Sequence, residues 1–125
     1  MHLVLGARGR RDRYKRQGLG ASARAADEVW LTNEGSHGER PEAIVEELRV
    51  GLAGGDGTVR TVLDRREAIS GAVLAAGPRD VVLVVGRGHE TTMTDDGAPV
   101  PFDDAAVARE ALESVTLGLV TERAS

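Results

Sequence analysis

The chain has 125 residues, no cysteine and a net charge of −4. This length suits one domain with its own core, and the lack of cysteine excludes a disulfide framework or a thiolate metal site. No apolar stretch is as long as a membrane span and the first residues do not resemble a secretory signal, so we expect a cytoplasmic protein. Aromatic residues make up only 2%, which argues against a stacking surface for single-stranded nucleic acid.

The charge is unevenly distributed along the chain. Residues 1–26 hold seven bases and one acid, a net charge of +6, so the remainder carries −10. One cationic loop on an acidic protein indicates a local anion site, although most charge runs are simply solvated surface.

Strand patterns alternate with helix patterns along the chain. We expect strands at residues 2–6, 28–32, 59–63 and 80–85. Helices are expected at residues 17–26, from Pro41 to the stop at Gly54, from a cap at Asp64 to Gly77, and after a cap at Asp103. A hairpin with an Asp-Asp-Gly turn is expected at residues 91–102, which could add an antiparallel edge to the sheet, and a frayed tail at residues 121–125.

This order predicts an α/β fold: a Rossmann-like, mostly parallel sheet with helices on both faces and a C-terminal hairpin, as one domain over residues 1–120. Residues 81–85 are apolar without alternation and predict a central strand covered on both faces. Loops 7–16, 33–40 and 86–92 each follow a strand and should meet beyond its carboxyl end, where ligands bind in such sheets. An open edge would allow a homodimer.

The three loops carry complementary chemistry. The first has arginines and the only lysine, Lys15, which suit carboxylate or phosphate oxygens. The second has Glu34 and His37, and the third has Gly86 and Glu90 after the strand. Cationic and anionic walls together suit an amino acid or another zwitterion. The short glycine motif at residues 86–88 is weak alone and equally fits a tight turn.

Several motifs in order resemble the C-terminal domain of the Mur ligase family, which adds amino acids to peptidoglycan precursors. The family pattern G-x-G-G-D-R-D-x-x-K-R-P is matched by residues 6–17, and T-x-D-N-P-R by residues 32–37. The pattern G-K-G-H-E is matched by residues 86–90, and a following F-x-D-x-x-x-A-R-x-x-L helix by residues 102–112. The likeness is greatest to the member that adds the third residue of the peptide stem.

The resemblance implies ATP-dependent amide formation through an acyl phosphate. It implies substrate-binding roles for Arg11, Glu34, His37, Gly86 and Glu90, and a place near the nucleotide phosphates for the basic pair Lys15 and Arg16. It implies no catalytic residue and no metal ligand in this chain.

Departures from the pattern change the expected ligand and the expected partners. His37 replaces an arginine, Arg10 an acid and Gln17 a proline, so a different amino acid or amine is expected in place of diaminopimelate. No G-x-x-x-x-G-K-[ST] phosphate loop is present. ATP and Mg would therefore come with a separate P-loop ligase subunit that lacks its own C-terminal domain. A non-catalytic binding module or an excised fragment are the alternatives, and nucleic-acid binding is the weakest.

Other polar residues have plainer interpretations. Asp95 and Asp96 fit turn chemistry, and Asp103 and Asp104 fit helix capping. The pair Arg65-Arg66 fits a solvated helix surface, and a hydrogen-bonded structural role is favoured for His89 over metal ligation.

Overall fold

The computed structural model describes residues 1–11 and 13–124, with side chains as far as residue 115. Its centre is a parallel sheet in the order β3-β2-β1-β4. The strands are β1 (His2–Leu5), β2 (Glu28–Leu31), β3 (Thr58–Thr61) and β4 (Val82–Val84). The expected parallel α/β sheet is confirmed, and each strand lies within two residues of its expected position.

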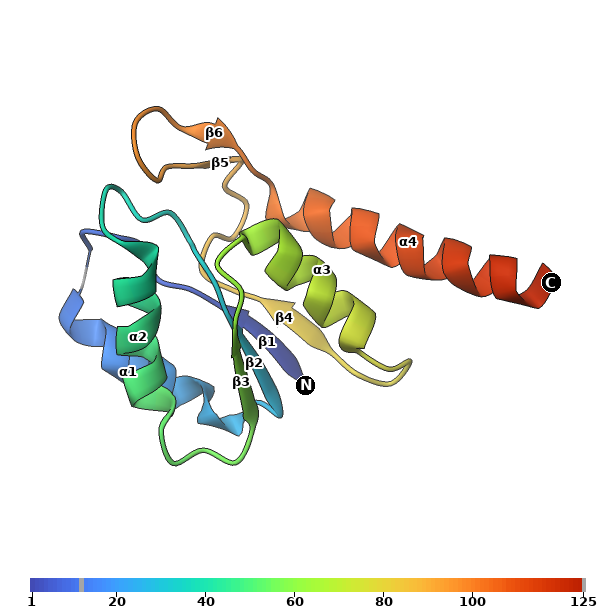
Figure 1. Cartoon of the computed structure of the whole chain (residues 1–125), viewed down its shortest axis with the longest axis horizontal. Helices are drawn as coiled ribbons and strands as arrows, with labels where there is room; N and C mark the ends of the chain where they lie inside the picture. The colour runs from blue at the N-terminus through green and yellow to red at the C-terminus, as the bar shows by residue number, and fades with distance from the viewer. Residues whose placement is uncertain (12, 125) are drawn as a thin grey trace.

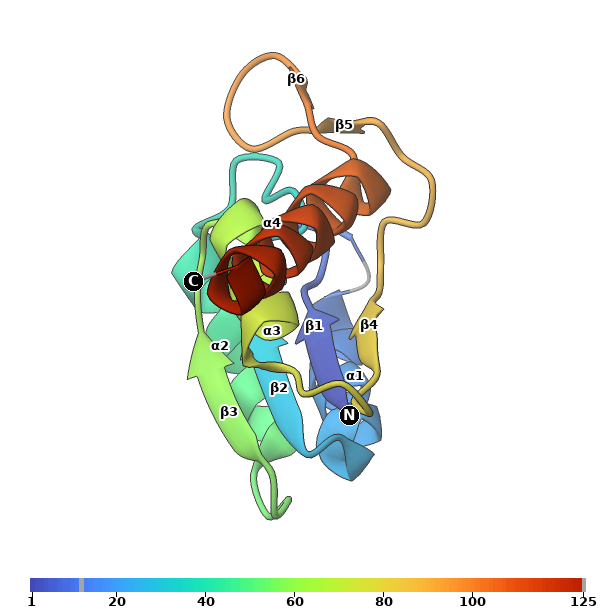
Figure 2. The ribbon, with the colours of Figure 1, turned by 90° about the vertical axis from the view of Figure 1, so that its right-hand side faces the viewer.

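Helices cover both faces of the sheet (Figures 1 and 2). On one face lie α1 (Arg16–Ser22) and α2 (Pro41–Leu52), and on the other lie α3 (Arg65–Ala75) and α4 (Asp104–Ala124). Successive residues of a strand point to opposite faces of the sheet. Leu3 and Leu5 therefore pack with α2, whereas Val4 packs with α3 and α4. The sheet is therefore the middle of a three-layer domain.

The helix boundaries follow local sequence signals. Pro41 begins α2, where a missing amide hydrogen costs nothing. The Asp64 side chain accepts a hydrogen bond from the Glu67 backbone N–H and caps α3. The helix expected at residues 17–26 is shorter, because α1 ends at Ser22 and a 3-10 turn follows at Ala23–Ala25. Among the described helices, none has the length and apolarity to cross a membrane.

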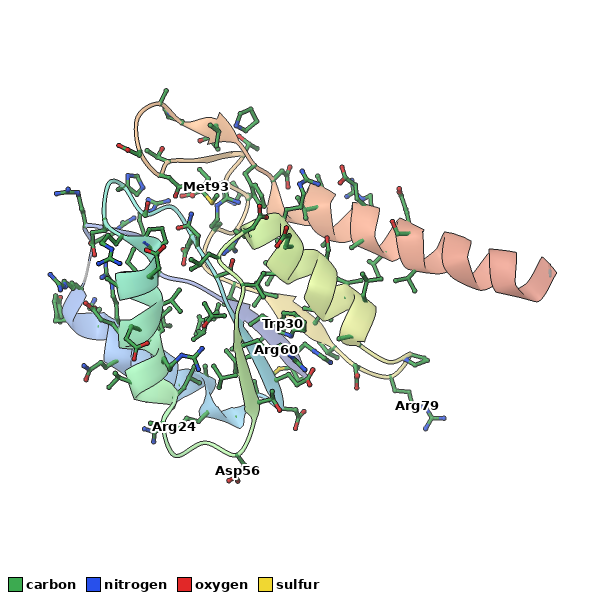
Figure 3. The ribbon with its side chains drawn as sticks, in the orientation of Figure 1. Arg24, Trp30, Asp56, Arg60, Arg79 and Met93 are labelled. Carbon is green, nitrogen blue, oxygen red and sulfur yellow. The ribbon has the colours of Figure 1, made fainter. Side chains whose placement is uncertain are left out.

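Trp30 belongs to the α3 face of the core. Its side chain is buried, its Nε1–H donates to His2 Nδ1 at 3.3 Å, and the Arg60 guanidinium lies 4.7 Å from its ring centre. Figure 3 shows Trp30 and Arg60 together beside α3, whereas Arg24, Asp56 and Arg79 lie at the end of the molecule away from the hairpin.

The prediction that residues 81–85 form a central, doubly covered strand is wrong. β4 pairs only with β1 and forms the edge of the sheet. Val81 is 56% exposed and Leu83 is 42% exposed, so this chain covers these side chains only in part. The apolar run has the composition of a buried strand, yet its neighbours within this chain leave one edge and part of one face open.

The hairpin forms, but it does not extend the main sheet. β5 (Thr92–Met93) and β6 (Val100–Pro101) pair antiparallel as a separate two-stranded ribbon. It stands above the carboxyl ends of the parallel strands (Figure 2). A frayed tail is expected at residues 121–125, but the backbone of residues 121–124 belongs to α4; their side chains and Ser125 lie outside the described part.

Candidate functional site

The three predicted loops meet at the carboxyl end of the sheet, beyond the ends of the paired strands β1 and β4. Three adjoining hollows of about 480, 340 and 130 Å³ lie there, and Arg8 lines all of them. The strand order reverses between β1 and β4. Open α/β sheets bind ligands beyond the carboxyl ends of the strands at such a point. We call these hollows together the cleft.

The five predicted ligand residues all line this cleft. Arg11, Glu34 and Gly86 share one hollow, Glu34, His37 and Glu90 share another, and Arg11 and His37 share the largest. The geometry is thus compatible with a common ligand.

The first loop packs tightly against the second. The Gly9 N–H donates to the Gly35 carbonyl at 2.8 Å, and a Cβ at Gly9 would meet the Ser36 carbonyl oxygen at 1.6 Å. Only glycine fits at this contact. Beyond it, Arg10 has a φ of +56° and its Nε donates to the His37 carbonyl at 2.7 Å. These contacts fix the backbone of Gly9 and Arg10 beside the cleft.

Arg11 and Lys15 are the free cations of the cleft wall. Both are exposed. Neither side chain forms a hydrogen bond or an ion pair with another residue in the part of the chain that the structure describes; Lys15 only lies over the Tyr14 ring, at 5.7 Å. Their charges are available to an anionic ligand.

Arg16, unlike Lys15, is buried and paired with acids, so the two residues of the predicted basic pair differ in their environment. Its side chain is 1% exposed and its guanidinium binds Glu39 at 2.9 Å and Glu47 at 3.3 Å. The Glu39 pKa falls to about 2 because Arg16 and the Arg10 backbone N–H bind its charged form. Arg16 ties the first loop to α2, and of the pair only Lys15 is exposed.

The second loop is fastened to the hairpin through Asp95. Asp95 Oδ1 accepts from Asn33 Nδ2 at 2.6 Å and from the Ser36 N–H at 3.0 Å, and the His37 N–H donates to the Thr94 carbonyl at 3.1 Å. Burial alone would raise the pKa of Asp95, but these bonds outweigh it and lower the pKa. Asp95 therefore does more than form a turn, which was its predicted role.

Glu34 is the buried acid of the cleft. It is 8% exposed, and burial raises the pKa of its carboxyl more than Arg65 and Arg8 lower it. Its carboxylate occupies the space that a side chain at Gly86 would need, since a Cβ there would lie 2.5 Å from Glu34 Oε2.

Glu90, on the third loop, is already paired within the chain. Arg8 Nη2 lies 2.6 Å from each Glu90 carboxylate oxygen. This contact holds the pKa of Glu90 below its usual range. His89 next to it is exposed and has no hydrogen-bond partner among the described residues, so the structural role expected for His89 is not found.

A buried cluster of Arg65, Arg87 and Asp104 lies behind the second and third loops. Asp104 accepts from Arg65 at 2.8 Å and from Arg87 at 2.7 Å, and both guanidinium groups are fully buried. Arg65 also binds the carbonyls of Asn33 and Val85, and Arg87 binds those of Thr92 and Phe102. Burial would raise the pKa of Asp104, yet the two arginines lower it.

Two predictions are therefore corrected. Arg65 is a buried anchor, whereas only Arg66 is a surface residue, paired with Glu110 at 2.7 Å. Asp103 alone caps α4, through hydrogen bonds from the N–H groups of Ala105 and Ala106, and Asp104 holds the cluster. Two adjacent residues of the same type at the start of a helix point in different directions. The sequence alone does not show which of the two is buried.

Two features of the cleft concern phosphate and metal ligands. The first loop follows a strand, but its N–H groups at Gly9 and Arg10 bind Gly35 and Glu39 within the chain. In the described part of the chain, no group of three or more His, Asp or Glu residues could hold a metal ion.

The fold and this cleft define an α/β domain with a basic site beyond the carboxyl ends of its parallel strands. Residues 1–88 match the family model described as "Mur ligase, glutamate ligase domain". The chain is similar to the UDP-N-acetylmuramoyl-L-alanyl-D-glutamate–2,6-diaminopimelate ligase of Acidovorax sp. (strain JS42), 44% identical over 87% of this chain and 22% of that one. The ligase of that name from Geobacillus thermodenitrificans (strain NG80-2) is 40% identical over 90% of this chain and 23% of that one.

A solved structure of a ligase of the same name superimposes with a TM-score of 0.85 at 32% identity, over 92% of this chain and 24% of that one. The chain belongs to the Mur ligase family and corresponds to its glutamate ligase domain. It spans less than a quarter of the length of these relatives.

Proposed function

We propose that this chain is the amino-acid or amine binding domain of a Mur-type, ATP-dependent amide ligase, that it acts together with a separate P-loop subunit, and that it forms no amide bond alone. The observation that carries the proposal is the unpaired Arg11 guanidinium in a cleft that also holds Glu34, His37, Gly86 and Glu90. The relatives, whose names describe diaminopimelate ligases, support the ligase class.

The chain's own residues would position the nucleophile. The Arg11 fork can hold the ligand carboxylate in a bidentate pair, while Glu34 and His37 line the wall along which the side chain extends. ATP and Mg, when bound by the partner, supply the activated acyl phosphate. This domain then presents the ligand amine to that carbonyl and lowers the entropic cost of the encounter. Lys15, an exposed cation that lines the same hollow as Arg11, would face the partner's phosphates.

The open edge at β4 is the proposed contact with the P-loop subunit. β1 forms hydrogen bonds with every second residue of β4 and the positions next to it. These include the Val81 carbonyl, which accepts from His2, and the Val85 N–H, which donates to Val4. The backbone groups of Val82 and Val84 point to the other edge. The exposed side chains of Val81 and Leu83 flank them. A further strand would be paired there, and its crossover helix would cover these side chains.

A stand-alone binding or regulatory module is the second candidate, because the cleft can hold a ligand whether or not a partner is present. In both candidates the setting is cytoplasmic, in peptidoglycan assembly or in a specialised metabolite pathway. Nucleic-acid binding is disfavoured. Most basic side chains of residues 1–26 bind other parts of the chain, leaving Arg11 and Lys15 unpaired among the described residues.

Binding to the isolated chain tests the proposed cleft. Titrating the ¹⁵N-labelled protein with a panel of amino acids should shift amide signals of the three loops, and Arg11→Ala should weaken the binding roughly tenfold. Arg66→Ala, which removes an exposed arginine on α3, is the control and should bind as the parent does. The proposal fails if no amino acid binds, or if Arg11→Ala binds like the control.

A further inference from the structure

We propose that Arg8 sets the ligand class of the cleft: because it covers the carboxylate of Glu90, the cleft selects an amino acid whose side chain ends in a carboxylate over one whose side chain ends in an ammonium group. This inference rests on the proposed function, since it concerns the same cleft.

The Arg8–Glu90 contact is the first step. One nitrogen, Nη2, lies 2.6 Å from both Glu90 oxygens, so the guanidinium sits directly against the carboxylate. Arg8 and Glu90 both line the smallest hollow, and Arg8 also lines the other two. A ligand ammonium that approached Glu90 would have to displace a cation already in place.

The position of Arg8 is fixed by its backbone. Its carbonyl accepts from the buried Arg16 Nη2 at 3.2 Å, and the next residue, Gly9, is locked against Gly35 and Ser36. The Arg8 side chain is 27% exposed, compared with 73% for Arg13 in the same loop. Arg8 also stands where the pattern G-x-G-G-D-R-D has its second glycine, a residue with no side chain to reach Glu90.

The other charges around Glu90 reinforce the same preference. Arg11 and Lys15 form no ion pair among the described residues and line the hollow that holds Gly86, and the charge of Arg11 also helps to lower the Glu90 pKa. The remaining acid of that hollow, Glu34, is buried, and its raised pKa disfavours the charged form. Of the three hollows of the cleft, Asp95 and Asp96 line only the one of about 480 Å³. Near Glu90, therefore, the uncompensated charge is positive.

The consequence is a choice between side chains. Every amino acid brings the same α-carboxylate and α-ammonium, so these groups do not discriminate. With the α-carboxylate on Arg11, a side-chain carboxylate can bind Lys15. In the two smaller hollows a side-chain ammonium meets only Glu90, which is paired with Arg8, and the buried Glu34. We therefore expect glutamate or 2-aminoadipate to bind better than ornithine or lysine, whose side chains end in an ammonium group alone.

Two opposite substitutions separate this account from a general charge effect. Arg8→Gln frees Glu90 and should shift the affinity ratio roughly fivefold or more towards ornithine and lysine. Glu90→Gln frees Arg8 and should shift the ratio towards glutamate and 2-aminoadipate. Arg66→Gln, which breaks the exposed pair with Glu110 and changes the net charge as Arg8→Gln does, should leave the ratio unchanged.

The test is an NMR titration of the whole chain and each folded variant with these four amino acids. A parent preference for the two acidic ligands that Arg8→Gln weakens or reverses supports the inference. A parent preference for ornithine or lysine, or an unchanged ratio in Arg8→Gln, overturns it while the proposed function stands. Failure of all four ligands to bind parent and variants alike overturns the proposed function, and this inference with it.

Discussion

The carboxylate of Glu34 lies where a side chain at Gly86 would have to be. A Cβ on Gly86 would come within 2.5 Å of Glu34 Oε2, and Gly86 has a φ of +107°. The end of β4 and the loop after β2 can approach this closely only because position 86 has no side chain. This contact shapes the hollow that Arg11 lines.

Gly86→Ala should therefore deform the cleft as well as strain the backbone. Gly97 is a matched control, since its φ is +93° and a Cβ there would meet nothing within 4 Å. Each substitution should cost about 1 kcal/mol or more from backbone strain alone. Only Gly86→Ala should also weaken amino-acid binding, as measured by titration. Equal binding losses in the two variants would show that the Glu34 contact has no role in the cleft.

Glu39→Gln should remove part of the acid sensitivity of the fold. The Glu39 pKa is lowered from 4.5 to about 2, so its stabilising contribution is present above 4.5 and is lost as the pH falls towards 2. At pH 7 the variant should lose about 1–2 kcal/mol, because buried Arg16 keeps only Glu47 as a charged partner.

Urea unfolding between pH 2 and 7 measures this effect. The difference between parent and Glu39→Gln should shrink as the pH falls below 4.5. The control is Glu42→Gln, an exposed acid 4.0 Å from Arg40, which should match the parent throughout. A difference that stays constant with pH would contradict the assigned pairing.

Asp104 and Asp103 should differ sharply although they are neighbours. Asp104→Ala leaves the buried Arg65 and Arg87 without their carboxylate and should cost about 3–5 kcal/mol of stability. Asp103→Ala removes only the cap of α4 and should cost about 1 kcal/mol. Chemical unfolding of both variants compares the two losses. Similar losses would mean that the cluster does not hold the loops as described.

The exposed edge of the sheet predicts where a partner binds. Leu83→Glu on β4 should weaken co-purification with a P-loop subunit more than tenfold, whereas Leu74→Glu, on the exposed side of α3, should not. Size-exclusion chromatography of each variant alone reports folding and self-association. If Leu83→Glu instead abolishes a homodimer and leaves partner binding intact, the edge serves a second copy of this chain.

Much of the fold could be predicted because its signals are local. Strand and helix patterns, Pro41 and the caps at Asp64 and Asp103 depend on neighbouring residues, and the structure confirms them. The exposure of Val81 and Leu83 could not be predicted, because composition indicates which residues can be buried and not which neighbours this chain supplies.

The convergence of the candidate residues followed from topology, but their pairing did not. Arg8 meets Glu90 across 82 positions of the chain, and Arg65 meets Asp104 across 39. In the sequence, Arg8 and Arg65 look no different from the exposed arginines beside them. Only the folded structure shows which guanidinium lies against an acid. Arg16 is the same case, since its acids Glu39 and Glu47 lie on another segment.

Reconstitution with a P-loop ligase subunit tests the central claim most directly. The subunit would be recovered from the native extract on this chain as bait and identified by mass spectrometry, and ADP release and amide product would then be measured. We predict ATP-dependent product only when chain, subunit, acceptor carboxylate and amino acid are all present, and its loss with Arg11→Ala. Product from the subunit without this chain, or no product from any mixture in which both proteins bind, would contradict a role for this domain in amide formation.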